Sequence, residues 1–317
     1  MDFDAISSFL EKSAGRGENV WQLNSLSAIA NHRIPDVVTG IQDTLLRADM
    51  TTLWTQWFLE SICDPERFVE RYPCYSHIVH AVNAEAPLIF ATVDINKREE
   101  LVKQISRLIN DEVRRRQSRK RTAFDLRIKQ YLWDVYGSEH RCWICGYQFS
   151  RWAIDKFLER TISEELRIPQ FIDYLKPHGL NKRDFQIEID HVFPFAEGGD
   201  EKPENLRLAC GWCNSHKAGR LSIYDVAAQP LIALHPQKGT VSIPHPFWVV
   251  RVLSLRRHCE HEKGCSKALE NSELTVTPRH PDGSMNPTNL RVTCIEHDSI
   301  GSARLVSRLV GGQMWKK

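Results

Sequence analysis

The sequence predicts an α+β protein in which a mainly helical N-terminal domain precedes two small ββα units, each held together by a metal ion. Three observations support this prediction. Apolar residues recur at three- and four-residue spacing through much of residues 1–110. Two Cys-x-x-Cys pairs, Cys142-Trp-Ile-Cys145 and Cys210-Gly-Trp-Cys213, flank a segment that contains an Asp-His pair. A related set of residues returns 84 positions later, near the C-terminus.

Length and composition are those of a globular protein. The chain has 317 residues, 42% hydrophobic and 26% charged, which excludes disordered and fibrous classes and allows two or three domains. A net charge of +2 means that any nucleic-acid surface must come from local clusters of basic residues. No signal peptide or apolar run of about 20 residues is present. We therefore expect a cytoplasmic protein without a membrane partner, whose nine cysteines serve mainly as metal ligands.

Residues 1–121 are predicted to form a helical domain. Apolar series run from Ile41 to Ile62 and from Leu101 to Ile109, and the Trp and Phe residues of this domain are interpreted as core. Segment 87–93 is too short and too apolar to assign to a strand or to a helical turn. Dimerisation, partner docking and target recognition are all open as functions of this domain.

The densest run of positive charge, Arg114-Arg-Arg-Gln-Ser-Arg-Lys-Arg121, ends this domain. Such a run is most often a solvated helix face. Directly before a metal-binding module, however, it could neutralise backbone phosphates. The predicted DNA contacts within it are Arg114, Arg115, Arg116, Arg119, Lys120 and Arg121.

Residues 122–224 are predicted to form the central metal-binding domain. Separated Cys-x-x-Cys pairs commonly build a tetrahedral zinc site, because each pair offers two sulfurs to one ion. Cys142, Cys145, Cys210 and Cys213 are therefore the predicted ligands of a structural zinc. Residues 146–187 between the pairs are predicted to be an insertion with two helices, near 152–158 and 171–175, which could line a DNA channel or cap the hairpin.

The stretch Glu188-Ile-Asp-His-Val-Phe-Pro194 is followed by Gly198-Gly199, Asn205-Leu206 and Cys210-Gly-Trp-Cys-Asn-Ser-His-Lys217. Taken with Cys142-Trp-Ile-Cys145, this order resembles the HNH (ββα-metal) endonucleases that carry a zinc-bound cysteine quartet. The resemblance covers roughly residues 125–222. It implies hydrolysis of DNA phosphodiester bonds to a 5′-phosphate and a 3′-hydroxyl.

The resemblance also assigns roles to four residues. Asp190 and Asn214 are implied to be oxygen ligands of one catalytic cation, His191 the general base that activates water, and Asn205 the brace of the loop that orients the base. Oxygen ligands suit Mg²⁺ or Mn²⁺, and an imidazole with a free pKa of about 6.5 suits proton abstraction at neutral pH. Because neighbours on a strand point to opposite faces, Asp190 and His191 can serve different roles.

His216 is the rival of Asn214 for the third position of the H-N-H triplet. Two residues along a helix rotate a side chain by about 200°. His216 is therefore expected to face away from Asn214, at the surface or toward DNA, whereas Lys217 lies on the side of Asn214 and is predicted to contact a phosphate. The alternative for the whole stretch is a zinc ribbon with a chance Asp-His pair.

Residues 225–317 are predicted to be a degenerate copy of the central domain. Adding 84 to the residue number places Val192, Gly199, Asn205 and Cys210 on identical residues without a gap. Cys213 then corresponds to His297, and Asp190, His191 and Asn214 correspond to Leu274, Thr275 and Asp298. The predicted ligands of a second structural zinc are Cys259, Cys265, Cys294 and His297, with His258 or His261 as alternatives.

The sequence thus predicts a metal-dependent HNH endonuclease. By analogy with similar architectures, its expected setting is restriction or anti-phage (antiviral) defence. Two alternatives remain: a non-catalytic zinc protein that binds nucleic acid, and a nuclease subunit that is silent until a partner defence protein docks. A lone ββα unit approaches one strand of DNA, so cutting both strands requires a homodimer or two successive nicks.

Overall fold

Helices form the N-terminal part of the protein, as the apolar spacing predicts. The computed structural model describes residues 3–14, 23–31, 33–70, 74–117, 123–137 and 139–316. This part contains α1 (Phe3–Ala14), α2 (Leu23–Ala30), α3 (Asp36–Thr39), α4 (Asp43–Ile62), α5 (Tyr75–Ile89) and α6 (Ile95–Arg116), with 3-10 turns η1 (Gly40–Gln42) and η2 (Pro65–Phe68). Segment 87–93, which the sequence leaves unassigned, is the end of α5 and the turn after it.

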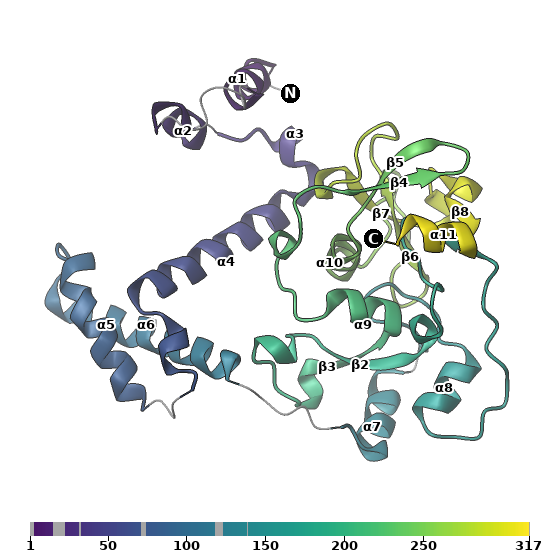
Figure 1. Ribbon diagram of the computed structural model, residues 1–317, viewed down its shortest axis with the longest axis horizontal. Helices are drawn as coiled ribbons and strands as arrows, with labels where there is room; N and C mark the ends of the chain where they lie inside the picture. The colour runs from purple at the N-terminus through teal and green to yellow at the C-terminus, as the bar shows by residue number, and fades with distance from the viewer. Residues whose placement is uncertain are drawn as a thin grey trace.

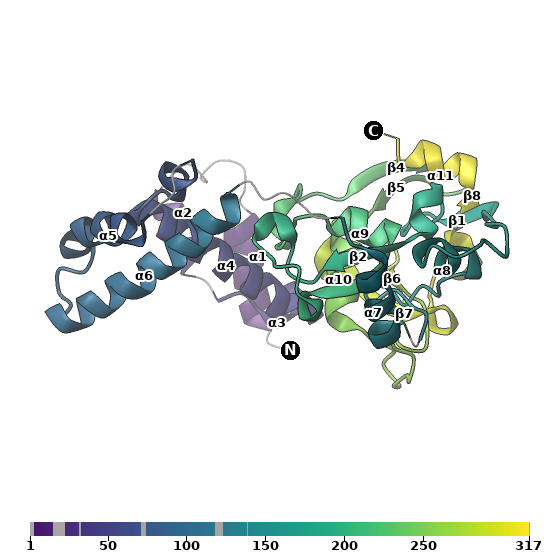
Figure 2. The same ribbon diagram turned by 90° about the horizontal axis from the view of Figure 1, so that it is seen from below.

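Helix α4 connects two separate hydrophobic cores (Figure 1). Ile62 at its end belongs to a small core shared with α5 and α6, whereas Leu45 near its start belongs to the larger core of residues 123–316, the body. Figure 2 shows α4, α5 and α6, the helical arm, extending away from the body. Between the cores, Trp54 and Trp57 are 61% and 56% exposed, so their interpretation as core is wrong. Helical spacing alone does not show which stretch of a long helix is covered.

Hydrogen bonds from buried polar side chains fix the arm to the body. Gln42, which is fully buried, donates from Nε2 to the carbonyl of Leu290 at 3.1 Å. Asp49 accepts from the N–H of Ile223 at 2.8 Å and from Arg251 Nη2 at 2.7 Å. Buried polar groups are costly unless they are bonded, so these contacts specify one docking position for the arm.

The first ββα unit is a hairpin with a helix folded back onto it. Strands β2 (Ile187–His191) and β3 (Leu206–Cys210) pair antiparallel, and α9 (Gly211–Lys217) packs on both. Before them lie α7 (Leu126–Tyr136), α8 (Arg151–Phe157) and the short strand β1 (Phe171–Asp173).

One of the two helices predicted in the insertion is wrong. Residues 151–157 form α8, but Phe171–Asp173 is strand β1, which pairs antiparallel with β8 (Leu305–Ser307). Phe171 is exposed while Ile172 is buried, as expected for the alternation of a strand. The partner strand is far away in the sequence, so local spacing cannot reveal the pairing.

The second ββα unit lies beside the first and shares its hydrophobic core. Its hairpin consists of β6 (Leu274–Pro278) and β7 (Leu290–Cys294). The 3-10 turn η8 (Ile295–His297) follows β7 where helix α9 follows β3, so the helix predicted at this place in the second copy does not form. The hairpin of β4 (Leu231–His235) and β5 (Gly239–Ile243), the helices α10 (Pro246–Arg256) and α11 (Arg308–Met314), and strand β8 complete the body. The predicted α+β class with small antiparallel sheets is confirmed.

The strand registers show how the two hairpins correspond. Ile187 lies opposite Cys210 in the first hairpin, and Leu274 lies opposite Cys294 in the second. The first strands of the two hairpins therefore correspond at a spacing of 87 residue numbers, and the second strands at a spacing of 84. The second hairpin has a turn that is three residues shorter.

This difference corrects the gapless alignment. Asp190 and His191 correspond to Thr277 and Pro278, not to Leu274 and Thr275. Backbone pairing fixes strand register, and a shorter turn changes every correspondence on one side of it. Correspondences after the turn keep the spacing of 84.

Candidate metal centre and catalytic site

The four cysteines predicted to bind the first zinc lie together. Their sulfur atoms are all within 4.8 Å of one another, and all four residues are buried. Two come from the loop after α7 and two from the junction of β3 with α9, so the cluster joins these elements. Four clustered sulfur donors suit a tetrahedral zinc, and an ion bound there would fix the loop and α9 to the hairpin.

Asp190 and His191 end strand β2 on opposite faces of the hairpin. Both are only 3% exposed. Asp190 Oδ2 accepts a hydrogen bond from Trp143 Nε1 at 3.0 Å, and Oδ1 pairs with Lys217 Nζ at 3.1 Å. The His191 ring lies near the rings of Phe124 and Phe195, with centroids 5.9 and 5.5 Å away. The loop of Cys142 and Cys145 and helix α9 therefore hold the carboxylate, while the imidazole packs near aromatic rings.

Asn214 lies in the first turn of α9 and faces a second carboxylate. Its Nδ2 donates to Glu188 Oε2 at 2.5 Å. Glu188 also accepts two hydrogen bonds from Arg183, at 2.6 and 3.0 Å. Glu188 lies two residues before Asp190 and so on the same face of β2. The hairpin face that meets α9 thus carries two carboxylates beside the Asn214 amide.

Asn205 closes the loop between β2 and β3. Its Oδ1 accepts the N–H of Phe193 at 2.8 Å, and its Nδ2 donates to the carbonyls of Phe193 at 3.0 Å and Asp200 at 2.8 Å. A Cβ on Gly199 would collide with the Phe193 carbonyl, so this position requires glycine. Both the amide and the glycine therefore define the backbone that follows His191.

Comparison with known families now identifies this arrangement. Residues 179–220 match the family model of the HNH endonuclease. This segment is an HNH endonuclease domain. It contains Asp190, His191, Asn205 and Asn214 together with the hairpin and α9. No curated protein and no solved structure matches the chain.

The sequence did not predict the positioning roles of Glu188, Trp143 and Lys217, the last of which was expected to contact a phosphate. Trp143 and Lys217 hold Asp190, and Glu188 holds Asn214. A signal for Glu188 was available in its spacing of two from Asp190 along the strand. Trp143 had no such signal, because it reaches Asp190 only through the fold of the loop that holds Cys142 and Cys145.

Two residues of α9 do not lie where the sequence suggested. Lys217 is 8% exposed and bonds to the Asp190 carboxylate and the His191 carbonyl, so it does not present its ammonium to a phosphate at the surface. His216 is partly buried beside Trp212, with ring centroids 4.8 Å apart, and burial lowers its pKa to about 4. Its expected surface position is wrong, because α10 packs on α9 and covers that side of the helix.

The basic end of α6 reaches the loop that follows His191. The Arg115 guanidinium lies 5.4 Å from the centroid of the Phe193 ring. Arg114 is exposed, whereas Arg116 pairs with Glu60 and, at 2.8 Å, with Glu112. Arg119, Lys120 and Arg121 lie outside the described residues. Arg115 also pairs with Glu112, at the longer distance of 3.3 Å, and reaches the Phe193 ring. Of the three described arginines, Arg114 and Arg115 are therefore the better placed to meet a ligand of the HNH domain.

The second cluster unites the predicted residues Cys259, Cys265, Cys294 and His297. Their donor atoms also lie within 4.8 Å of one another, so this set too could hold zinc. The alternative ligand His261 instead stacks on the His297 ring at 3.8 Å.

The cysteine loops of the two units are held in the same way. The N–H of Trp143 donates to the carbonyl of Leu208 at 3.1 Å. In the second unit, the N–H of Glu260 donates to the carbonyl of Val292 at 2.9 Å. Leu208 and Val292 occupy equivalent positions on β3 and β7. The shared contact relates the loop of Cys142 to that of Cys259.

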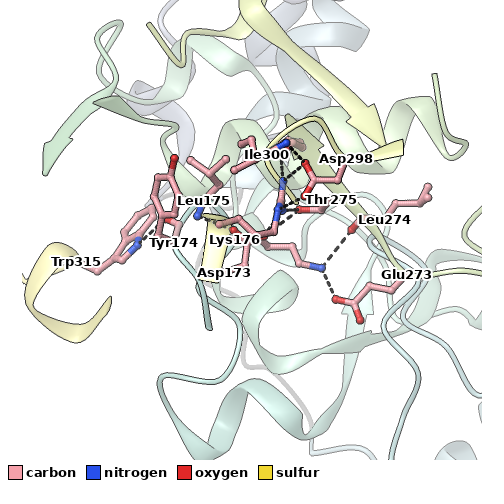
Figure 3. Close-up of polar contacts among 12 residues, drawn as sticks. Asp173, Tyr174, Leu175, Lys176, Glu273, Leu274, Thr275, Asp298, Ile300 and Trp315 are labelled. Carbon is pink, nitrogen blue, oxygen red and sulfur yellow. Dashed lines mark hydrogen bonds and ion pairs between the residues drawn. The ribbon is translucent and has the colours of Figure 1, made fainter. Parts of the chain in front are cut away.

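A guanidinium occupies the second unit where the HNH domain carries Glu188 and Asn214. By strand register and the spacing of 84, the counterparts of these two residues are Thr275 and Asp298. Figure 3 shows both gathered with Asp173. Arg304 donates to Asp298 at 2.6 Å, to Thr275 at 2.6 Å and to Asp173 at 2.5 Å. The protein's own cation thus neutralises this region of the second unit.

No helix among the described residues is both long enough and apolar enough to cross a membrane.

Proposed function

We propose that the protein is a metal-dependent DNA endonuclease that hydrolyses phosphodiester bonds with His191 as the general base. The observation that carries this proposal is the pair of Asp190 and His191 at the end of β2. Asp190 is held by Trp143 and Lys217, and His191 packs near two aromatic rings on the opposite face. A fixed carboxylate next to a fixed imidazole in an HNH domain suits water activation beside a bound cation.

The residues would divide the chemistry as follows. A Mg²⁺ or Mn²⁺ held by oxygens of Asp190 and Asn214 would neutralise the scissile phosphate and stabilise the leaving oxygen. His191 would accept a proton from the water whose oxygen attacks phosphorus, and the 3′-oxygen would leave. Trp143 and Lys217 would orient Asp190, and Glu188 would orient Asn214. Asn205 would keep the loop after His191 in place.

DNA would approach along the end of α6. Arg114 and Arg115 supply positive charge beside the loop after His191, and phosphate contacts of this kind position a duplex without reading its sequence. Arg119, Lys120 and Arg121 extend the same run in the sequence. Arg116 is engaged by carboxylates of the arm and is assigned a structural role.

A setting in restriction or anti-phage defence, in the cytoplasm, belongs to the same proposal and rests on analogy with similar architectures. The exposed Trp54 and Trp57 favour a nuclease whose arm meets a second copy or a partner defence protein. A requirement for that contact would make cleavage depend on assembly.

Cleavage of supercoiled plasmid tests the proposal. Wild type, His191→Ala and the control His80→Ala, which alters an exposed histidine of α5, are compared with Mg²⁺, Mn²⁺ or EDTA. We expect metal-dependent nicking by the wild type and the control and none by His191→Ala, with zinc content and DNA binding unchanged. Wild-type cleavage by His191→Ala would refute the base. A folded, zinc-loaded wild type that does not cut would favour the partner-gated or the non-catalytic protein.

A further inference from the structure

A cavity of about 550 Å³ opens beside the candidate catalytic residues of the HNH domain. It lies between β2 of the hairpin, the residues that lead into α7, and α8 of the insertion. Its volume falls within the range of about 300–1,000 Å³ that small-molecule sites occupy. We infer that this cavity receives a single unpaired nucleotide of the DNA strand next to the cut, an inference that rests on the proposed nuclease function.

One side of the cavity is apolar and aromatic. Phe124 and Phe157 contribute rings, and Ile187 and Ile189 contribute the aliphatic side chains of β2. Aromatic and aliphatic surfaces accept the flat face of any base, which is how proteins bind unpaired nucleotides without sequence preference. This side of the cavity is therefore assigned to the base.

The charges that line the cavity suit a phosphate. Lys129, Lys156 and Arg183 face it, against the single carboxylate of Glu188. Arg183 pairs with Glu188 at 2.6 Å, and Lys129 pairs with an exposed glutamate at 2.7 Å. Lys156 lies 5.1 Å from the centre of a tryptophan ring, and the described residues offer it no carboxylate within ion-pair distance. Lys156 is therefore the cation assigned to the phosphate of the bound nucleotide.

The cavity is continuous with the candidate catalytic site. Asn214 and Glu188, which are hydrogen-bonded at 2.5 Å, line the cavity and also belong to the proposed cation site. Phe124 lines the cavity too, and its ring lies 5.9 Å from that of His191. A nucleotide in the cavity would thus adjoin the phosphate that His191 and Asn214 act on. The amide and the carboxylate at this end can bond to the edge of its base.

The second ββα unit has a smaller cavity in the equivalent place, with different chemistry. It measures about 380 Å³, and Leu274, Thr275 and Asp298 line it where Ile187, Glu188 and Asn214 line the first. Its charged walls carry three carboxylates, and these pair with the two cations Lys176 and Arg304, so neither cation is left to meet a phosphate. The ββα fold therefore forms a cavity in both units, and only the cavity of the HNH domain suits a nucleotide.

A base pair stays stacked in the duplex and does not enter a cavity of this size, so the bound nucleotide must be unpaired or turned out of the helix. Turning out is easiest at a mismatch or in a single strand. We therefore expect faster cleavage beside an unpaired base than within a matched duplex.

Photo-crosslinking tests the cavity without relying on cleavage. His191→Ala protein is bound to a single-stranded oligonucleotide containing 5-iododeoxyuridine, irradiated, and the modified peptides are mapped by mass spectrometry. We expect crosslinks to Phe124 or Phe157, and at least a fivefold loss of oligonucleotide affinity in Lys156→Glu. The matched control Lys12→Glu, at the end of α1, should bind as before. Crosslinks confined to other regions, or unchanged affinity in Lys156→Glu, would overturn the inference.

Two further arms separate the possible outcomes. Free deoxythymidine monophosphate is titrated against the oligonucleotide complex, and equal affinity of the free nucleotide would show a small-molecule site and overturn the assignment to a DNA strand. Wild-type protein is assayed on plasmid in parallel. Cleavage without the expected crosslinks refutes the cavity alone. The expected crosslinks without cleavage refute a nuclease that acts without a partner, while the nucleotide site stands.

Discussion

Trp143 joins the first cysteine cluster to the proposed cation ligand Asp190, and Trp143→Phe removes that link. The indole N–H donates to Asp190 Oδ2 at 3.0 Å, while Lys217 pairs with Oδ1 at 3.1 Å. Phenylalanine keeps an aromatic ring between Cys142 and Cys145 and deletes only the donor. A hydrogen bond to a charged group contributes about 1.5–3 kcal/mol. Because about 1.4 kcal/mol is a factor of ten in rate, kcat for cleavage should fall roughly ten- to hundredfold.

The assay is the initial rate of plasmid nicking as a function of Mg²⁺ concentration, with zinc content measured on the same samples. The control is Trp133→Phe, because that tryptophan lies in the same body but stacks on His140 at 4.9 Å. We expect Trp143→Phe to lower kcat, or to require more Mg²⁺ for the same rate, with zinc retained. Wild-type rates and Mg²⁺ dependence in a zinc-loaded Trp143→Phe would show that this bond does not orient Asp190.

Three further predictions concern stability. Arg304→Met leaves the buried Asp298 carboxylate without its guanidinium. The free energy of unfolding, measured by urea titration, should fall by about 3–5 kcal/mol, and an unchanged urea midpoint would contradict this. Burial lowers the pKa of His178 below 6.5, so the unfolded chain takes up the proton first and stability is lost as pH falls below that value. His178→Phe should therefore lose less thermal stability than wild type between pH 7.5 and pH 5.5 at constant zinc content, and equal losses would rule out His178 as the source. Cys210→Ser should contain one zinc fewer per chain and should give a lower yield of soluble protein. The control Cys63→Ser, in the arm, should keep its full zinc content, and full zinc in Cys210→Ser would exclude Cys210 as a ligand.

The metal clusters and the Asp-His pair were accessible from the sequence because their chemistry is local. A Cys-x-x-Cys pair brings two sulfurs to one side of a tight loop whatever surrounds it, and only the combination of pairs depends on the fold. The adjacency of Asp190 and His191 likewise sends their side chains to opposite faces of any strand. Even the irregular set from Cys259 to His297 followed from residue type and order, and the structure brings the same four residues together.

Tertiary structure decided the features that depend on distant partners. Strand pairing made Thr277 the counterpart of Asp190 in the second hairpin, because backbone hydrogen bonds, not residue identities, set the register across the shorter turn. Burial of Lys217 against Asp190 and exposure of Trp54 both contradict what helical spacing suggests, because spacing gives the face of a helix and not the element that covers it.

The sequence by itself determined the chemical groups of this protein: two sets of donors that could hold zinc, one Asp-His pair and two asparagines in the order of an HNH domain. Only the tertiary structure decided which groups hold them. Trp143 reaches Asp190, and Glu188 reaches Asn214, through the way the cysteine loop and α9 fold against the hairpin. These contacts cross large sequence separations, and a side chain's partner is fixed by packing in three dimensions, which a one-dimensional pattern does not encode.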